Sequence, residues 1–167
     1  VLLDIGIGRG DHVGLVAENR YEWLLIDQAL AGLGIVDVPR GSDTTPTEMR
    51  FILEHSGCCA AFADNDKVAR DLMAMKPELP KLKHVIVMAD ETKVDGATAL
   101  GELMATGRAK QEEMANQVKA ARTAVMPDDL LTIVYTSGTT AEPKGVMLTH
   151  NNVLSNMRVI QEVLHVT

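Results

Sequence analysis

Short apolar runs alternate with longer helix-prone segments along most of this chain. Five runs have the length of buried strands, and several are rich in Val and Ile. They are residues 13–17, 35–38, 58–63, 85–88 and 130–135. Helices are expected over residues 20–33, 46–56, 66–75, 98–122 and 151–164. Strands that alternate with helices predict an α/β layered sandwich with a mostly parallel sheet.

Capping residues support the first two predicted helices. Asn19, with Glu22 three residues later, has the spacing of a capping box. Thr45 is a suitable N-cap, Pro46 suits the first helical position, and Gly57 can end the helix. One face of the first helix is apolar, with Trp23, Ile26, Leu30 and Leu33.

Two residues are expected to interrupt secondary structure, and one short connection predicts how two strands pair. Pro39 is expected to end the strand 35–38, because proline has no N–H to donate. Gly107 is expected to interrupt the helical segment 98–122. The apolar run 146–149 follows the strand 130–135 after only about ten residues, which is too short for a parallel crossover. These two strands are therefore predicted to form a hairpin.

The tip of this hairpin concentrates groups that bind polyphosphate. Residues 135–145 read Tyr-Thr-Ser-Gly-Thr-Thr-Ala-Glu-Pro-Lys-Gly, with four aliphatic hydroxyls, two glycines and one lysine. Glycine lets backbone N–H groups approach a phosphate, hydroxyls donate hydrogen bonds, and an ammonium adds a compact positive charge. The residues expected to bind phosphate are Thr136, Ser137, Gly138, Thr139, Thr140, Lys144 and Gly145. Tyr135 is expected to pack at the strand end, and His150 to begin the final helix.

The loop is not the common P-loop, because Lys144 is followed by Gly145 rather than by Ser or Thr. The pattern Thr-Ser-Gly-Thr-Thr-x-x-Pro-Lys-Gly instead resembles the signature loop of the adenylate-forming (AMP-binding) superfamily. The sequence Gly-Asp-x-Val-x-Leu-x-x-x-Asn at 10–19 and the continuation at 146–152 are also similar to that family. Within it, the chain looks most like the bacterial long-chain fatty acid–CoA ligases.

The resemblance implies a fold, an activity and a set of ligands. Residues 1–167 would be an incomplete N-terminal AMP-binding domain, since family members are several times longer and carry a further C-terminal domain. The loop would hold the β- and γ-phosphates of ATP while a fatty acid carboxylate attacks the α-phosphate. An acyl-adenylate and pyrophosphate would form, and coenzyme A would then take the acyl group. Mg²⁺ is expected to be required, while its carboxylate ligand and the catalytic residues are expected downstream of Thr167.

The residues before Thr167 leave other interpretations open. One is an adenylating enzyme with a different acid, or with acyl carrier protein as acceptor. Another is a non-catalytic remnant that binds a nucleotide or a protein partner. The loop also has Ala141 where family loops usually have glycine, so an αL conformation there would cost about 1–2 kcal/mol.

Composition restricts the partners. The chain is 46% hydrophobic and 23% charged, as expected of globular protein rather than a disordered segment. Its net charge is −7, and no basic run exceeds two residues, which argues against nucleic acid as a partner. No apolar stretch reaches the ~18 residues of a membrane span. A cytoplasmic location is predicted, and peripheral membrane association remains a hypothesis.

Cys58 and Cys59 are adjacent in a predicted strand. Neighbouring strand residues point to opposite faces, so a disulfide between them would be strained. We expect small buried thiols, with His55 near a helix end, rather than a metal site. This cysteine usage favours a reducing compartment.

Overall fold

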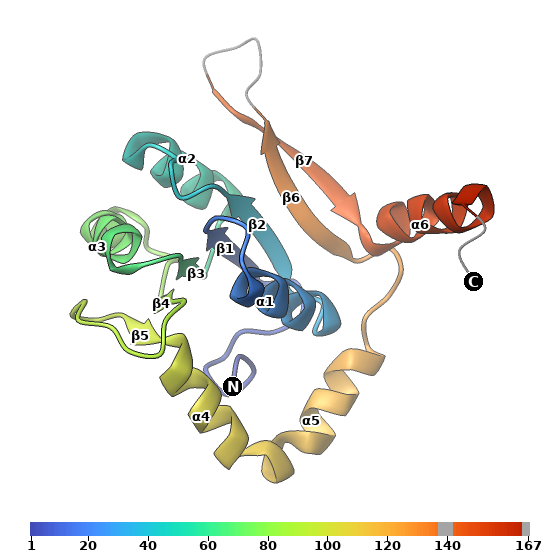
Figure 1. Ribbon diagram of the computed structural model, residues 1–167, viewed down its shortest axis with the longest axis horizontal. Helices are drawn as coiled ribbons and strands as arrows, with labels where there is room; N and C mark the ends of the chain where they lie inside the picture. Colours follow the sequence, from blue (N-terminus) through green and yellow to red (C-terminus); the bar gives the residue numbers. More distant parts are fainter. Residues whose placement is uncertain (137–141, 165–167) are drawn as a thin grey trace.

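Seven strands form one sheet in the computed structural model, which describes residues 1–136 and 142–164 (Figure 1). The strands are β1 (His12–Val16), β2 (Val36–Arg40), β3 (Ala60–Ala63), β4 (His84–Val87), β5 (Thr98–Ala99), β6 (Leu130–Thr136) and β7 (Lys144–Thr149). Their order in the sheet is β5-β4-β3-β1-β2-β6-β7. All neighbouring pairs are parallel except β6 and β7, which form an antiparallel hairpin. The predicted α/β fold and the predicted hairpin are both confirmed.

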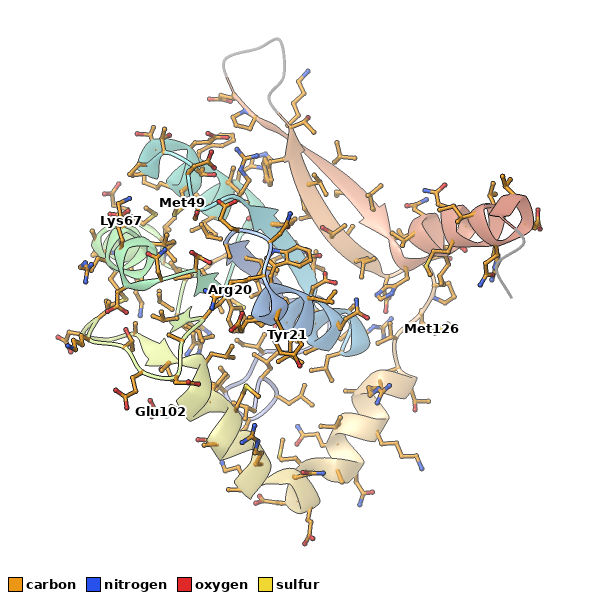
Figure 2. The ribbon with its side chains drawn as sticks, viewed as in Figure 1. Arg20, Tyr21, Met49, Lys67, Glu102 and Met126 are labelled. Carbon is orange, nitrogen blue, oxygen red and sulfur yellow. The ribbon has the colours of Figure 1, made fainter. Side chains whose placement is uncertain are left out.

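Helices cover both faces of the sheet. The helices of the described residues are α1 (Tyr21–Gly32), α2 (Pro46–Ser56), α3 (Asp66–Met75), α4 (Leu100–Ala109), α5 (Gln111–Thr123) and α6 (His150–Leu164), with a short 3₁₀ turn at Lys76–Glu78. Those that cover the sheet are α1 to α4. Buried side chains of α2 and α3, Met49 of α2 among them, pack on one face (Figure 2). Buried side chains of α1 and Leu100 of α4 pack on the other. Alternate residues of the parallel strands thus supply two cores.

The second helix forms where its capping residues predict. The Thr45 hydroxyl accepts a hydrogen bond from the Glu48 backbone N–H, Pro46 is the first helical residue, and Gly57 ends the helix with φ of +68°. Its fit against the sheet is close: a Cβ on Gly14 of β1 would lie 2.6 Å from the Leu53 Cδ2 atom. Helix α2 is therefore fixed at both ends and along its length.

Local signals were wrong at the start of α1. The N-cap is Arg20 rather than Asn19, and no side chain caps the helix. The Arg20 guanidinium donates a 2.7 Å hydrogen bond to the Glu22 carboxylate. Because Glu22 is engaged there, it does not complete the capping box that the spacing suggested.

Tertiary contacts also overturned the two predicted breaks. Pro39 lies inside β2, which continues to Arg40. The Ala17 N–H donates to the Arg40 carbonyl, so pairing with β1 continues without an N–H from proline. Gly107 lies inside α4, and the two helices meet instead at Lys110. A Cβ on Gly107 would lie 2.6 Å from a methyl of Val1, so close packing explains this glycine.

Candidate functional site

Two of the predicted phosphate-binding side chains lie opposite each other at the end of the hairpin. Thr136 is the last residue of β6 and Lys144 the first of β7, and they are paired in register. Directly opposite residues of an antiparallel pair point to the same face. Both residues are exposed, so a hydroxyl and an ammonium are available side by side to a ligand from solvent.

Most of the loop between Thr136 and Lys144 lies outside the residues that the structure describes. Gly145 is described, as the second residue of β7. Four of the predicted phosphate contacts lie outside the described residues, namely Ser137, Gly138, Thr139 and Thr140. Ala141 also lies outside them.

Gly145 is required by packing against its neighbours on β6. It pairs in register with Tyr135. A Cβ at this position would lie 2.9 Å from the Ile133 Cγ2 atom and 3.1 Å from the Tyr135 Cζ atom. We expected Gly145 to give phosphate access to the backbone, and the structure adds a steric reason for glycine here.

Tyr135 is buried and is held by two polar contacts. Only 4% of its surface is exposed, and its hydroxyl lies 2.6 Å from the His55 Nδ1 atom of α2. Its carbonyl accepts a 3.1 Å hydrogen bond from the Arg40 guanidinium at the end of β2. Burial raises the pKa of the Tyr135 hydroxyl. The expected packing of Tyr135 at the strand end is confirmed, and α6 begins at His150 as predicted.

Arg40 links this tyrosine to the start of α2. Its guanidinium forms an ion pair with Glu48 in the first turn of that helix. The Arg40 Nε atom is buried and has no hydrogen-bond partner among the described residues. Sequence reasoning missed His55 and Arg40 as neighbours of the loop, because they precede Tyr135 by 80 and 95 residues.

The other end of the hairpin is anchored by Asp129. Its carboxylate accepts two hydrogen bonds from Arg9, of 2.8 and 2.7 Å, and one from the Met126 N–H. The hydrogen bond from Arg9 is the main reason why the pKa of Asp129 falls to about 2. The Asp129 carbonyl accepts from the His150 N–H, so the same residue ties β6 to the start of α6.

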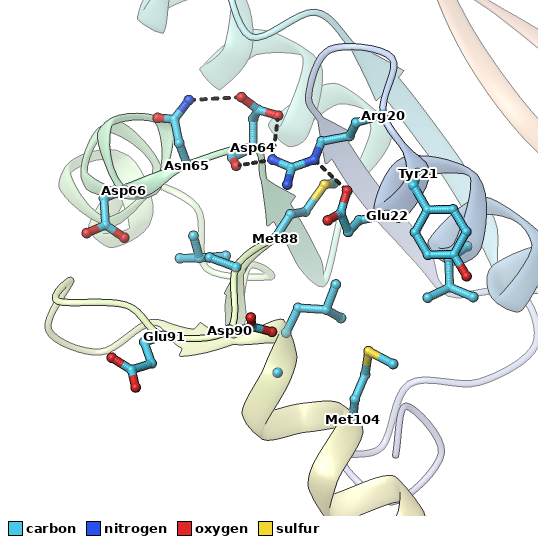
Figure 3. Close-up of a pocket in the computed structure, with 15 residues that line it drawn as sticks. Arg20, Tyr21, Glu22, Asp64, Asn65, Asp66, Met88, Asp90, Glu91 and Met104 are labelled. Atoms are coloured by element: carbon cyan, nitrogen blue, oxygen red, sulfur yellow. Dashed lines mark hydrogen bonds and ion pairs between the residues drawn. The ribbon is translucent and has the colours of Figure 1, made fainter.

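A separate hollow of about 660 Å³ lies where β1, β3 and β4 end (Figure 3). After β1 the chain adds β2 on one side of it and then β3 and β4 on the other side. Open α/β sheets commonly bind ligands between the two strands where the order switches sides, here β1 and β3. Arg20 and Tyr21 line it from the start of α1. Arg20 pairs there with Glu22 and, at 3.3 Å, with Asp64.

The charge of this hollow argues against a nucleotide. One guanidinium faces five carboxylates, those of Glu22, Asp64, Asp66, Asp90 and Glu91. An excess of negative charge repels the phosphates of ATP or coenzyme A. The hairpin therefore remains the candidate phosphate site. The signal missed in the sequence was the set of polar residues that follow each apolar strand.

The cysteines and the carboxylates offer no further reactive centre in the described part of the chain. Cys58 and Cys59 are both free thiols, and burial raises the pKa of Cys58 to about 12. Among residues 1–136 and 142–164, no group of three His, Cys, Asp or Glu side chains is arranged to hold a metal ion. No helix in those ranges is both long and apolar enough to cross a membrane.

Comparison with known proteins assigns the family. The model of the family described as AMP-binding enzyme matches residues 1–166. The chain belongs to the AMP-binding enzyme family. A relative from Arabidopsis thaliana, long chain acyl-CoA synthetase 7, peroxisomal, is 33% identical over 93% of this chain and 22% of its own length. The long-chain-fatty-acid–CoA ligase FadD15 of Mycobacterium tuberculosis is 30% identical over 94% of this chain and 25% of its own.

Solved structures support the same fold. The long-chain-fatty-acid-CoA ligase FadD1 from Archaeoglobus fulgidus aligns with a TM-score of 0.71 at 20% identity, over 99% of this chain and 30% of that one. This AMP-binding family chain thus spans about a quarter of the length of the curated relatives it matches. Relatives are named as peroxisomal and mitochondrial proteins, so the predicted cytoplasmic location stays a prediction.

Proposed function

We propose that residues 1–167 are part of the N-terminal AMP-binding domain of an AMP-forming ligase that activates a long-chain fatty acid. The observation that carries this proposal is the pairing of Thr136 with Lys144 at the end of the hairpin, within a chain of the AMP-binding family. The names of the relatives support the acyl-CoA ligase activity and the long-chain acid.

The proposed reaction has two steps. A carboxylate oxygen of the acid forms a bond to the α-phosphorus of ATP, the bond to the bridging oxygen breaks, and pyrophosphate leaves. The thiol of coenzyme A then loses its proton and attacks the acyl carbonyl, and AMP leaves. The first step needs positioning and charge neutralisation more than covalent participation by the protein.

The described residues can supply part of that stabilisation. The Lys144 ammonium would neutralise charge on the phosphates, and the Thr136 hydroxyl would donate a hydrogen bond to a phosphate oxygen. Mg²⁺ would add further positive charge when bound. Because no group of three His, Cys, Asp or Glu side chains among the described residues could hold a metal ion, we assign no metal ligand within this part of the chain.

Fatty-acid-dependent exchange of pyrophosphate into ATP by the full-length protein tests the proposal. Lys144→Gln should lower kcat/KM for MgATP by roughly 100-fold, as expected for the loss of a charged group that contacts the reacting phosphates. Lys67→Gln is the matched control. Lys67 is an exposed lysine of α3 whose only described ion pair is a 3.8 Å contact with Asp71, and its loss should leave exchange unchanged.

A panel of acids tests the substrate class. Relatives of similar identity are named long-chain and medium-chain ligases, so acids of different chain length, an aromatic acid and amino acids should be compared. Exchange driven only by an aromatic or amino acid would reject the fatty acid. Absence of exchange with every acid would reject the enzyme and favour a non-catalytic nucleotide-binding protein. An acyl-transfer assay with acyl carrier protein in place of coenzyme A tests which thiol accepts the acyl group.

A further inference from the structure

The end of β6 lies beyond the one position at which this strand is in register with β2. Strands β2 and β6 pair in register at one position, Asp37 with Thr132. Thr136 lies four residues farther along β6, where the hairpin projects beyond the end of β2 (Figure 1). Ladder hydrogen bonds to β2 therefore do not fix the position of Thr136 and of its partner on β7.

Contacts of the neighbouring residue Tyr135 can fix the position of Thr136 and Lys144. Its hydroxyl is held by His55, in the last turn of α2, and its carbonyl by Arg40, the last residue of β2. The His55 ring also meets the Tyr135 ring edge-on, with centroids 5.9 Å apart, and stacks on Phe51 at 5.4 Å. The side chain of Tyr135 is thus tied to α2, and its backbone carbonyl to β2.

Both elements contribute buried side chains to the same hydrophobic core. Helix α2 is capped by Thr45 and buries Ile52 and Leu53 against the sheet. Arg40 is itself paired with Glu48 at the start of the same helix. A residue tied to this body takes up a defined position relative to the sheet.

We propose that Tyr135, His55 and Arg40 form a clamp that positions Thr136 and Lys144 for the phosphates of ATP. Gly145 packs against the clamp, since a Cβ there would lie 2.9 Å from the Ile133 Cγ2 atom and 3.1 Å from the Tyr135 Cζ atom, so a larger residue would crowd both side chains. The three clamp residues are positioning residues, since they act on the ligand through the hairpin. This inference rests on the proposed function for the identity of the ligand, whereas the mechanical part of the clamp can be measured without it.

Hydrogen exchange of the full-length protein without ligand tests the mechanical part. Tyr135→Phe removes one hydroxyl, and a hydrogen bond of ordinary strength predicts about three- to tenfold faster exchange of hairpin amides near Lys144. Tyr21→Phe is the matched control, because Tyr21 is 75% exposed and its hydroxyl has no hydrogen bond within residues 1–136 and 142–164. Exchange in β1 should stay unchanged in both variants. Unchanged exchange in the hairpin of Tyr135→Phe would overturn the clamp.

The two half-reactions test its effect on the ligand. In pyrophosphate exchange, Tyr135→Phe and His55→Ala should each raise KM for MgATP about three- to tenfold. Transfer from preformed acyl-adenylate to coenzyme A involves no β- or γ-phosphate, so its rate should stay within about twofold of wild type. Equal losses in both half-reactions would indicate a purely structural role and overturn the proposal. If the wild type shows no exchange at all, the proposed function fails, and hydrogen exchange alone decides whether the clamp exists.

Discussion

Replacing the buried aspartate of β2 with asparagine, Asp37→Asn, should stabilise the protein at neutral pH. Asp37 lies near the start of β2 with only 4% of its surface exposed. Burial raises the pKa of its carboxyl from 3.8 to about 6, and the charge of Asp27 adds to the rise. Since a buried carboxylate without a cationic partner is unfavourable, the charged form destabilises the folded state.

The magnitude follows from the two pKa values. Between pH 3.8 and about 6 the folded state binds one more proton than the unfolded state, so the free energy of unfolding falls as pH rises through this range. The difference of about two units corresponds to about 3 kcal/mol, all of which is lost above the folded pKa. A neutral amide at this position would remove the titration. Asp37→Asn should therefore be up to about 3 kcal/mol more stable than wild type at about pH 7.5, and nearly equal to it below about pH 4.

Urea unfolding of the 167-residue chain measures this effect. Trp23, the one tryptophan of the sequence, packs beside the core on the α1 side and reports unfolding by fluorescence. Asp27→Asn is the control, and it should produce a much smaller pH-dependent change. A stability difference between wild type and Asp37→Asn that is the same from about pH 4.5 to 7.5 would refute the reasoning. An Asp37 carboxyl that titrates at its ordinary pKa would also refute it.

Two further predictions concern the packing and anchoring of the hairpin. Gly145→Ala should destabilise it by about 1–3 kcal/mol, because the added Cβ would lie 2.9 Å from a methyl of β6. Gly32→Ala, where nothing lies within 4 Å, should be neutral or stabilising in the same urea titration, and equal effects would contradict the steric argument. Arg9→Gln should raise the pKa of Asp129 from about 2 toward its ordinary value, measured by carboxyl NMR titration. Arg9→Lys should produce a smaller rise, and an unchanged titration in Arg9→Gln would show that the ion pair does not lower this pKa.

Sequence patterns predicted elements whose signals are local. Thr45, Pro46 and Gly57 bound α2 as expected, because each acts through its own backbone or through a residue three positions away. The α3 bounds also agree with the prediction. The hairpin followed from the shortness of one connection. Local signals misled where a distant contact competed: the Gly107 backbone accommodates Val1 rather than breaking a helix.

The candidate site, too, has features that were predictable from the sequence and features that were not. The hydroxyls, glycines and lysine of residues 136–145 are close together in the chain, so the sequence alone could predict phosphate binding there. The family that this loop resembles is the family to which the chain belongs. That Thr136 and Lys144 face the same side follows from the register of the hairpin. The prediction that the whole loop binds phosphate stays a prediction.

The sequence alone determined the alternation of strands and helices and the hairpin, and it predicted phosphate chemistry at the hairpin tip, because periodicity, capping and loop composition act over a few neighbouring residues. Only the tertiary structure decided that Asp37 is buried, and that His55 and Arg40 meet Tyr135. It also decided that the ends of β1, β3 and β4 enclose an acidic hollow. Each of these depends on the order of strands in the sheet, which brings together residues that lie far apart along the chain.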